Sequence, residues 1–105
     1  MLEAIKKMLG MGPATDFKAI LQKGGVIIDV RSKQEFQGGH IRNSINIPVD
    51  LLTSQLSKIS KDKPVITCCA SGMRSATAKS MLLAAGYKEV YNGGSWLGLQ
   101  HKIGQ

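Results

Sequence analysis

Two adjacent cysteines, Cys68 and Cys69, are followed by three small residues, and an arginine and a serine come soon after them in the stretch CCASGMRS. A cysteine sulfur becomes a nucleophile when it is held as a thiolate, and backbone N–H groups, the start of a helix and a nearby cation all favour that form. Residues 70–72 are small enough for the backbone to curl around the Cys69 sulfur and direct several N–H groups at it. We therefore predict that Cys69 is a nucleophilic thiolate whose pKa lies below that of a free cysteine. The predicted anion-binding loop consists of Ala70, Ser71, Gly72, Met73 and Arg74, with Arg74 as the charge partner and Ser75 in a supporting role.

This loop requires a strand before it and a helix after it. Residues 65–68 are a run of strand length, and a helix is predicted to begin at Arg74 and Ser75 because apolar positions recur along one face of the segment that follows. That face consists of Ala78, Met81, Leu82 and Ala85. Gly86 is suited to the left-handed residue that ends a helix. Cys69 is thus expected at the carboxyl end of a buried strand, where ligands bind in parallel α/β sheets.

The rest of the chain alternates strands with helices. Further strands are predicted at residues 26–30, 44–47 and 90–91, a turn at 92–94, and further helices at 15–23, 32–36, 48–59 and 96–103. This alternation with short connections predicts one α/β domain that has a mainly parallel central sheet with helices on both faces.

Length and charge limit the classes of protein and partner. The chain has 105 residues and a net charge of +7, so one domain is expected at residues 15–105 after an N-terminal segment at 1–14. Its apolar runs are far shorter than the roughly 20 residues of a membrane helix, and its N-terminus has no secretory pattern, so we expect a cytoplasmic protein with no membrane partner. The lysines are not interleaved with aromatic residues, which argues against nucleic acid. We expect a monomer whose partner is a small anion.

From Cys69 to Ser75 the sequence resembles the CxxGxRS active loop of rhodanese-like domains. Other landmarks of that family occur in the same order over about residues 15–100, namely Asp29-Val30-Arg31, Glu35-Phe36, Gly39-His40-Ile41, Asn46-Ile47-Pro48, Gly86-Tyr87 and Gly93-Gly94. The resemblance implies a single rhodanese-like domain in which Cys69 takes a sulfane sulfur from a donor such as thiosulfate, becomes a persulfide and passes the sulfur to a thiol or protein acceptor. It also implies that Asp29 and Arg31 help to shape the site. Such a reaction needs no metal or organic cofactor, and adjacent cysteines lack the CxxC spacing of a zinc site.

Three alternatives remain open. Cys68 and Arg74 also satisfy CxxxxxR, the loop length of cysteine-dependent phosphatases and related arsenate reductases, although Thr67 stands where the phosphatases usually have His. The domain could instead serve as a sulfur carrier or interaction module without small-molecule turnover. Cys68 could also act as a resolving thiol for Cys69.

Other residues near the predicted site have structural interpretations. Arg31 could form a salt bridge with Glu35, and His40 is expected to brace loops. Two features depart from the family pattern: Arg42-Asn43 stands where Pro-Gly or a similar pair is common, and Trp96 follows the preceding glycine pair more closely than the family's usual aromatic residue. The position of Trp96 leaves open how one wall of the pocket is built.

Overall fold

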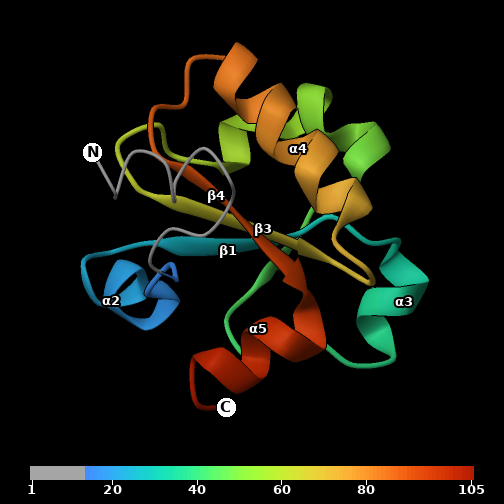
Figure 1. The fold of residues 1–105 in the computed structure, drawn as a ribbon. Helices are drawn as coiled ribbons and strands as arrows, with labels where there is room; N and C mark the ends of the chain where they lie inside the picture. The colour runs from blue at the N-terminus through green and yellow to red at the C-terminus, as the bar shows by residue number, and fades with distance from the viewer. Residues whose placement is uncertain (1–13) are drawn as a thin grey trace.

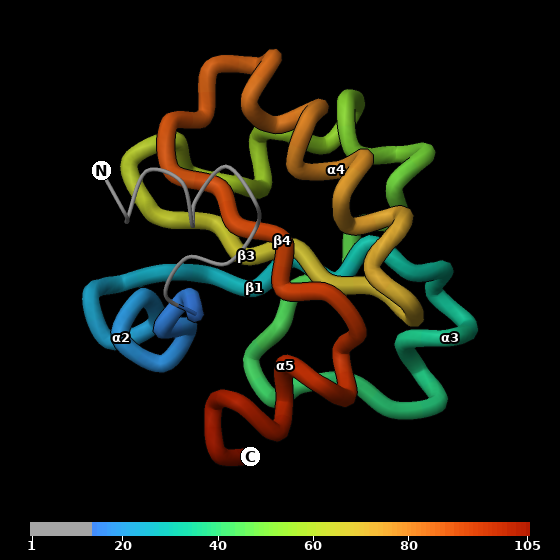
Figure 2. The backbone as a smooth tube through the Cα atoms, viewed as in Figure 1, coloured from blue at the N-terminus to red at the C-terminus, as the bar shows by residue number. Residues whose placement is uncertain are grey.

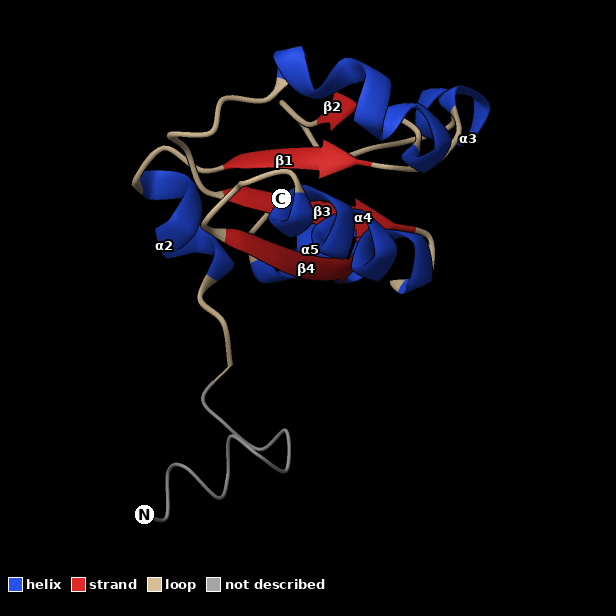
Figure 3. Cartoon of the chain, turned by 90° about the horizontal axis from the view of Figure 1, so that it is seen from above, coloured by secondary structure: helices blue, strands red, loops and turns tan. Residues whose placement is uncertain are grey.

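The structure is a computed structural model that describes residues 14–105. Its centre is a sheet of four parallel strands in the order β2-β1-β3-β4, so the predicted α/β architecture is confirmed. The strands are β1 (Val26–Asp29), β2 (Ile45–Asn46), β3 (Val65–Cys69) and β4 (Val90–Ser95). Figure 3 shows the four strands side by side with their arrowheads at the same end of the sheet.

Helices cover both faces of this sheet, as predicted. They are α2 (Phe17–Gln22), α3 (Lys33–Gln37), the 3-10 segment η1 (Val49–Lys58), α4 (Met73–Ala84) and α5 (Trp96–Lys102). In Figure 1, α4 and η1 lie on one face, whereas α2 and α5 lie on the other. The short helix α3 lies beyond the carboxyl ends of the strands (Figure 3). No helix within residues 14–105 is long and apolar enough to span a membrane.

Strand alternation divides the buried residues of β3 between two cores. Val65 and Cys69 belong to the core beneath α4 and η1, while Ile66 and Cys68 belong to the core beneath α2 and α5. Successive side chains of a strand point to opposite faces, so the two cysteine side chains lie on opposite sides of the sheet. Only Cys69 is on the face that α4 covers.

The structure corrects the prediction for residues 92–94, which lie within β4 and not in a turn. Thr67 pairs with Asn92 but Cys69 pairs with Ser95, so β4 carries one more residue than β3 over this stretch and forms a bulge. An Asn-Gly-Gly sequence is typical of turns, and the same residue types also permit a bulge inside a strand. These residue types alone therefore do not distinguish a turn from a bulge.

Residues 49–58 also differ from the expected regular helix. They form 3-10 helix on either side of Gln55, whose backbone is not helical. The apolar positions Val49 and Leu52, and then Leu56 and Ile59, are three residues apart, which suits the three-residue turn of a 3-10 helix. The single four-residue step spans the break at Gln55.

The ends of the other elements differ by one or two residues. Strand β3 includes Cys69, strand β1 ends at Asp29 and helix α4 begins at Met73, one residue before the predicted start. The predicted end of α4 is confirmed: Gly86 has a φ of 96°, and its N–H and that of Tyr87 donate to the last turn of the helix. The predicted N-terminal segment lies outside the described residues except for residue 14.

Candidate active site

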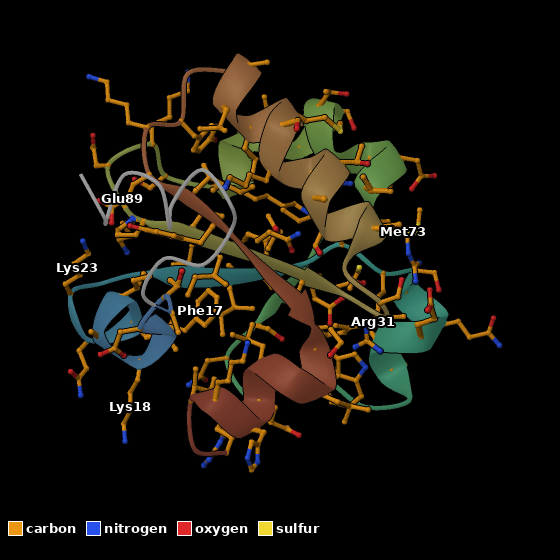
Figure 4. The ribbon with its side chains drawn as sticks, in the orientation of Figure 1. Phe17, Lys18, Lys23, Arg31, Met73 and Glu89 are labelled. Carbon is orange, nitrogen blue, oxygen red and sulfur yellow. The ribbon has the colours of Figure 1, made fainter. Side chains whose placement is uncertain are left out.

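The loop between β3 and α4 lies at the carboxyl end of the sheet, where the sequence places it (Figure 2). Cys69 is the last residue of β3, and Gly72 precedes the first helical residue of α4 with a φ of 100°. A left-handed backbone at Gly72 favours glycine and turns the chain sharply from strand to helix. Ala70 and Ser71 are exposed. Met73 is 79% exposed and points outward from the start of α4 (Figure 4).

Several hydrogen-bond donors converge on the Cys69 sulfur. The Gly72 N–H donates to Sγ at 2.9 Å and the Ser75 N–H at 3.4 Å, while the Ser75 hydroxyl oxygen lies 3.4 Å from Sγ. Burial by itself raises the pKa of the Cys69 thiol, because a thiolate loses solvation there. Hydrogen bonds from the Ser75 hydroxyl and from the N–H groups of Ser75, Gly72 and Ser71 outweigh burial and bring the pKa below its ordinary value. This is the predicted direction.

Arg74 has a partner that the sequence analysis did not name. Its guanidinium forms a bidentate ion pair with the Glu35 carboxylate, with distances of 2.7 and 3.0 Å. Helix α3 presents Glu35 through a capping box, in which Ser32 and Glu35 bond to each other's backbone N–H groups. The hydrogen bond from Arg74 is the main reason that the pKa of Glu35 falls to about 2. The cation at the end of the loop is therefore already paired with a carboxylate.

Asp29 and Arg31 form a buried pair at the carboxyl end of β1. The Arg31 guanidinium binds the Asp29 carboxylate with distances of 2.7 to 3.1 Å and also donates to the Gly39 carbonyl oxygen at 2.7 Å. The interpretation of Arg31 and Glu35 as a salt bridge is wrong, because Arg31 reaches only the Glu35 backbone carbonyl and the Glu35 carboxylate binds Arg74. Two strong acceptors thus hold Arg31 inside the molecule, near α3 in Figure 4.

Trp96 completes this buried arrangement. The Arg31 guanidinium carbon lies 4.6 Å from the centre of the Trp96 ring, which is a cation–π contact. The far edge of the same ring contacts Gly39, where an added Cβ would lie 3.2 Å from it. The shorter spacing between the glycine pair and Trp96 therefore places the ring over Arg31 and the loop at Gly39.

His40 has a local structural role. Its ring stacks on Phe36 with 3.7 Å between the ring centres, and its Nδ1 lies 2.8 Å from the Phe36 carbonyl oxygen. These contacts fix the segment after α3 against the helix, in agreement with the expectation that His40 braces loops.

The structure does not bring the Cys68 sulfur into the loop. Cys68 is fully buried in the core beneath α2 and α5. Burial, and next the charge of Asp29, raise the pKa of the Cys68 thiol. Both effects disfavour a thiolate, so this sulfur lacks the environment that surrounds Cys69.

Asn92 is a site residue that the sequence analysis missed. Its side-chain oxygen accepts a hydrogen bond from the Ser75 hydroxyl at 2.6 Å, and its side-chain nitrogen donates to the Gly72 carbonyl oxygen at 3.3 Å. The only sequence signal is its position before two glycines, and that pattern is equally typical of a turn. Asn92 is in register with Thr67, whose hydroxyl donates to the Ser75 carbonyl oxygen, so the strand pairing places the Asn92 side chain on the face that α4 covers.

Comparisons with known proteins agree on the family to which the chain is similar. Residues 13–98 match the model of a family described as Rhodanese-like domain. The chain is 31% identical over 80 residues to the thiosulfate sulfurtransferase GlpE of Pseudomonas savastanoi pv. phaseolicola, with 76% of each chain covered. It is 40% identical over 77 residues to the uncharacterized protein YqhL of Bacillus subtilis, with 73% of this chain and 60% of that protein covered. Among solved structures, it resembles a rhodanese with anions from E. coli, with a TM-score of 0.66 and 30% identity over 71% of this chain and 91% of that chain.

Proposed function

Because the chain belongs to the rhodanese-like domain family, we propose that it is a sulfurtransferase that moves a sulfane sulfur through a persulfide on Cys69. The observation that carries this proposal is the convergence of N–H and hydroxyl groups on the Cys69 sulfur. These groups stabilise a thiolate, and they are equally suited to the negatively charged outer sulfur of a persulfide. The name of the GlpE relative supports thiosulfate as the donor.

The reaction divides into two displacements. The Cys69 thiolate attacks the outer sulfur of thiosulfate, a sulfur–sulfur bond forms, and the sulfur–sulfur bond of thiosulfate breaks so that sulfite leaves with the bonding electron pair. A thiophilic acceptor such as cyanide or a thiolate then attacks the outer sulfur of the persulfide and regenerates the Cys69 thiolate. No proton has to move in either displacement when both nucleophiles are anionic. Lowering the pKa of Cys69 is thus the main chemical task of the loop.

A dianionic donor must approach an anionic sulfur. The loop N–H groups and the net charge of +7 both oppose this repulsion. Arg74 contributes to this only in part, because Glu35 neutralises its charge. The similar structure from E. coli is described as a rhodanese with anions, which agrees with anion binding by a domain of this kind.

The alternative reaction from Cys68 has less support. A phosphatase or arsenate reductase needs an accessible thiolate, whereas Cys68 is fully buried with a raised thiol pKa. A role as sulfur carrier uses the same persulfide and differs only in its acceptor. We expect the protein to act as a monomer in the cytoplasm, where free thiols stay reduced.

The first experiment is intact mass spectrometry of the reduced protein before and after thiosulfate, and again after cyanide. We compare the wild-type protein with Cys69→Ala and Cys68→Ala, which remove a sulfur from adjacent positions. The expected result is a gain of one cyanide-removable sulfur in the wild type and in Cys68→Ala, and no gain in Cys69→Ala. A gain that depends on Cys68, or no gain in the wild type, would contradict the proposal.

Turnover distinguishes an enzyme from a carrier. Steady formation of thiocyanate from thiosulfate and cyanide, beyond one equivalent per protein, supports the enzyme. A single equivalent followed by a stop favours the carrier, because cyanide then removes the sulfur once and thiosulfate does not reload Cys69.

A further inference from the structure

The Ser75 hydroxyl has one proton and three polar neighbours. Its oxygen lies 3.4 Å from the Cys69 sulfur, 2.6 Å from the Asn92 side-chain oxygen and 3.1 Å from the Gly72 carbonyl oxygen. A hydroxyl donates only one hydrogen bond at a time. The short distance to Asn92 makes that residue the main acceptor when Cys69 is a thiol, and the thiol S–H then donates to the Ser75 oxygen.

The orientation of the Asn92 amide follows from its partners at both ends. Its oxygen accepts the Gly94 N–H at 2.9 Å in addition to the Ser75 hydroxyl. Its nitrogen faces the Gly72 carbonyl oxygen, which can only accept. An inverted amide would set its N–H groups against the Gly94 N–H, so only the observed orientation satisfies these groups.

The β4 backbone leaves little freedom for Asn92 to move. A Cβ on Gly93 would lie 2.8 Å from the Thr67 carbonyl oxygen and 2.9 Å from Leu99, so the chain packs tightly there. On the other side, the position of a Cβ on Gly72 is 3.5 Å from the Gly94 Cα. The bulge and the active loop are therefore in backbone contact, and Asn92 bridges them.

We propose that Asn92 is a positioning residue for Cys69: its side-chain oxygen accepts the hydrogen bond of the Ser75 hydroxyl while Cys69 is a thiol, and the hydroxyl turns to donate to the sulfur when the thiolate forms. On ionisation the Ser75 hydroxyl rotates from Asn92 to the sulfur. The Asn92 oxygen keeps the Gly94 N–H, so no buried acceptor loses its only partner. The inference rests on the proposed function only in taking Cys69 as the reactive sulfur.

This role predicts opposite effects for two substitutions of similar size. Asn92→Leu removes the competing acceptor, so the Ser75 proton is free for the thiolate and the titration of Cys69 moves to lower pH. Asn92→Asp keeps both acceptor contacts and adds a negative charge, which strengthens the bond from Ser75 and repels the thiolate. The titration then moves to higher pH.

Other charged groups near Cys69 stay the same in both variants. The ion pair of Arg74 with Glu35 faces the loop from α4 and α3, and the pair of Asp29 with Arg31 lies at the carboxyl end of β1, where Asp29 is in register with Cys68. Lys33 and Asp50 line a pocket with Arg74, and Asp16 and Lys102 line a pocket with Asn92, while Cys68 lies on the far face of the sheet. None of them hydrogen-bonds to Ser75 or Asn92 in the part of the chain that the structure describes.

The test is the pH dependence of Cys69 alkylation by iodoacetamide, with the modified cysteine assigned by peptide mass. A midpoint shift of about half to one pH unit is expected in each direction, which is a change of about three- to tenfold in rate below the midpoint. Tyr91→Phe is the matched control on the same strand, because its hydroxyl donates to Glu89, which precedes the start of β4. Its midpoint should equal that of the wild type.

Ser75→Ala shows whether the effect passes through the hydroxyl. In this background Asn92→Leu should leave the midpoint unchanged, and Asn92→Asp should retain only the smaller effect of its charge. The proposal would be overturned if the midpoints of both Asn92 variants moved in the same direction or if neither moved. It would also be overturned if Asn92→Leu caused its full midpoint shift in the Ser75→Ala background. If Asn92→Leu does not fold, an Asn92→Asp variant whose alkylation midpoint falls or stays unchanged would still refute the proposal. Alkylation requires no persulfide, so this outcome is independent of whether sulfur transfer occurs.

Discussion

Cys68 and Cys69 are adjacent and chemically identical, yet their surroundings act on them in opposite directions. Burial raises the pKa of the Cys68 thiol, whereas hydrogen bonds from Ser75, Gly72 and Ser71 outweigh burial at Cys69 and lower its pKa. The difference follows from the two-residue period of a strand, which turns one sulfur toward the apolar core and the other toward the loop. Reactivity here depends on the face of the sheet.

At the same scale, the Glu35–Arg74 pair makes stability depend on pH. The hydrogen bond from Arg74 lowers the pKa of folded Glu35 from 4.5 to about 2, so the pair stabilises the fold above pH 4.5 and this contribution is lost as the pH falls toward 2. Glu35→Gln should therefore lose less stability than the wild type between about pH 6 and pH 3. Both side chains are more than a third exposed, so we expect a difference below about 1 kcal/mol in urea unfolding.

The control for this prediction is Asp62→Asn, which removes a carboxylate from an exposed turn. Its loss of stability over the same pH range should match that of the wild type. Equal acid sensitivity of Glu35→Gln and the wild type would show that the ion pair does not form in solution.

Among the elements, β4 supplies contacts to the site that the loop and α4 do not. Its pairing with β3 sets Asn92 beside Ser75, the bulge that follows lies where Gly94 contacts Gly72, and Trp96 then begins α5 directly after the strand. A bulge inserts a residue without ending a strand, and bulges are common beside active sites. Gly93 leaves no room for a Cβ, whereas Gly94 has open space there and a φ of 79°, a backbone conformation that favours glycine.

Gly93→Ala tests that packing. The new Cβ would lie within 3 Å of the Thr67 carbonyl oxygen, Ile66 and Leu99, and backbone cannot move away as a flexible side chain can. We expect a loss of about 1–3 kcal/mol in the free energy of unfolding, measured with urea. Gly38→Ala is the matched control, since its φ is −76° and its nearest contact would be 3.4 Å away; it should be close to neutral. A neutral Gly93→Ala would contradict the tight contact between β3, β4 and α5.

For the molecule as a whole, the excess of positive charge bears on its partners. A net charge of +7 attracts a dianionic donor over the Debye length, which shrinks from about 30 Å to about 8 Å between about 0.01 M and about 0.15 M salt. The rate of persulfide formation from thiosulfate should therefore fall several-fold over this range. Alkylation by uncharged iodoacetamide should change little. Equal salt dependence of the two reactions would rule out steering by the net charge.

A matched pair of variants locates this charge effect. Lys33 lies beside the loop, in a pocket lined also by Arg74, whereas Lys88 precedes β4 at the opposite end of the sheet. Lys33→Glu and Lys88→Glu change the net charge equally. Lys33→Glu should slow persulfide formation more, and equal effects would mean that the local position of the charge is irrelevant.

Local patterns in the sequence were enough to predict the architecture and the loop. Short apolar runs alternating with helical periods, together with the small residues between Cys69 and Arg74, are local patterns, and local patterns determine which element forms and roughly where. The strand–loop–helix unit, the α/β class, the faces of the helices and the end of α4 at Gly86 were all predictable on that basis.

Which side chains meet depends on the three-dimensional arrangement of the elements. Arg74 pairs with Glu35, and Asn92 reaches Ser75, because the parallel sheet brings the ends of distant strands together. Such contacts join residues 39 and 17 positions apart, so no local pattern encodes them. Whether residues 92–94 form a turn or a bulge is likewise not encoded by a local pattern. It depended on pairing with β3, a long-range interaction that the residue types permit but do not specify.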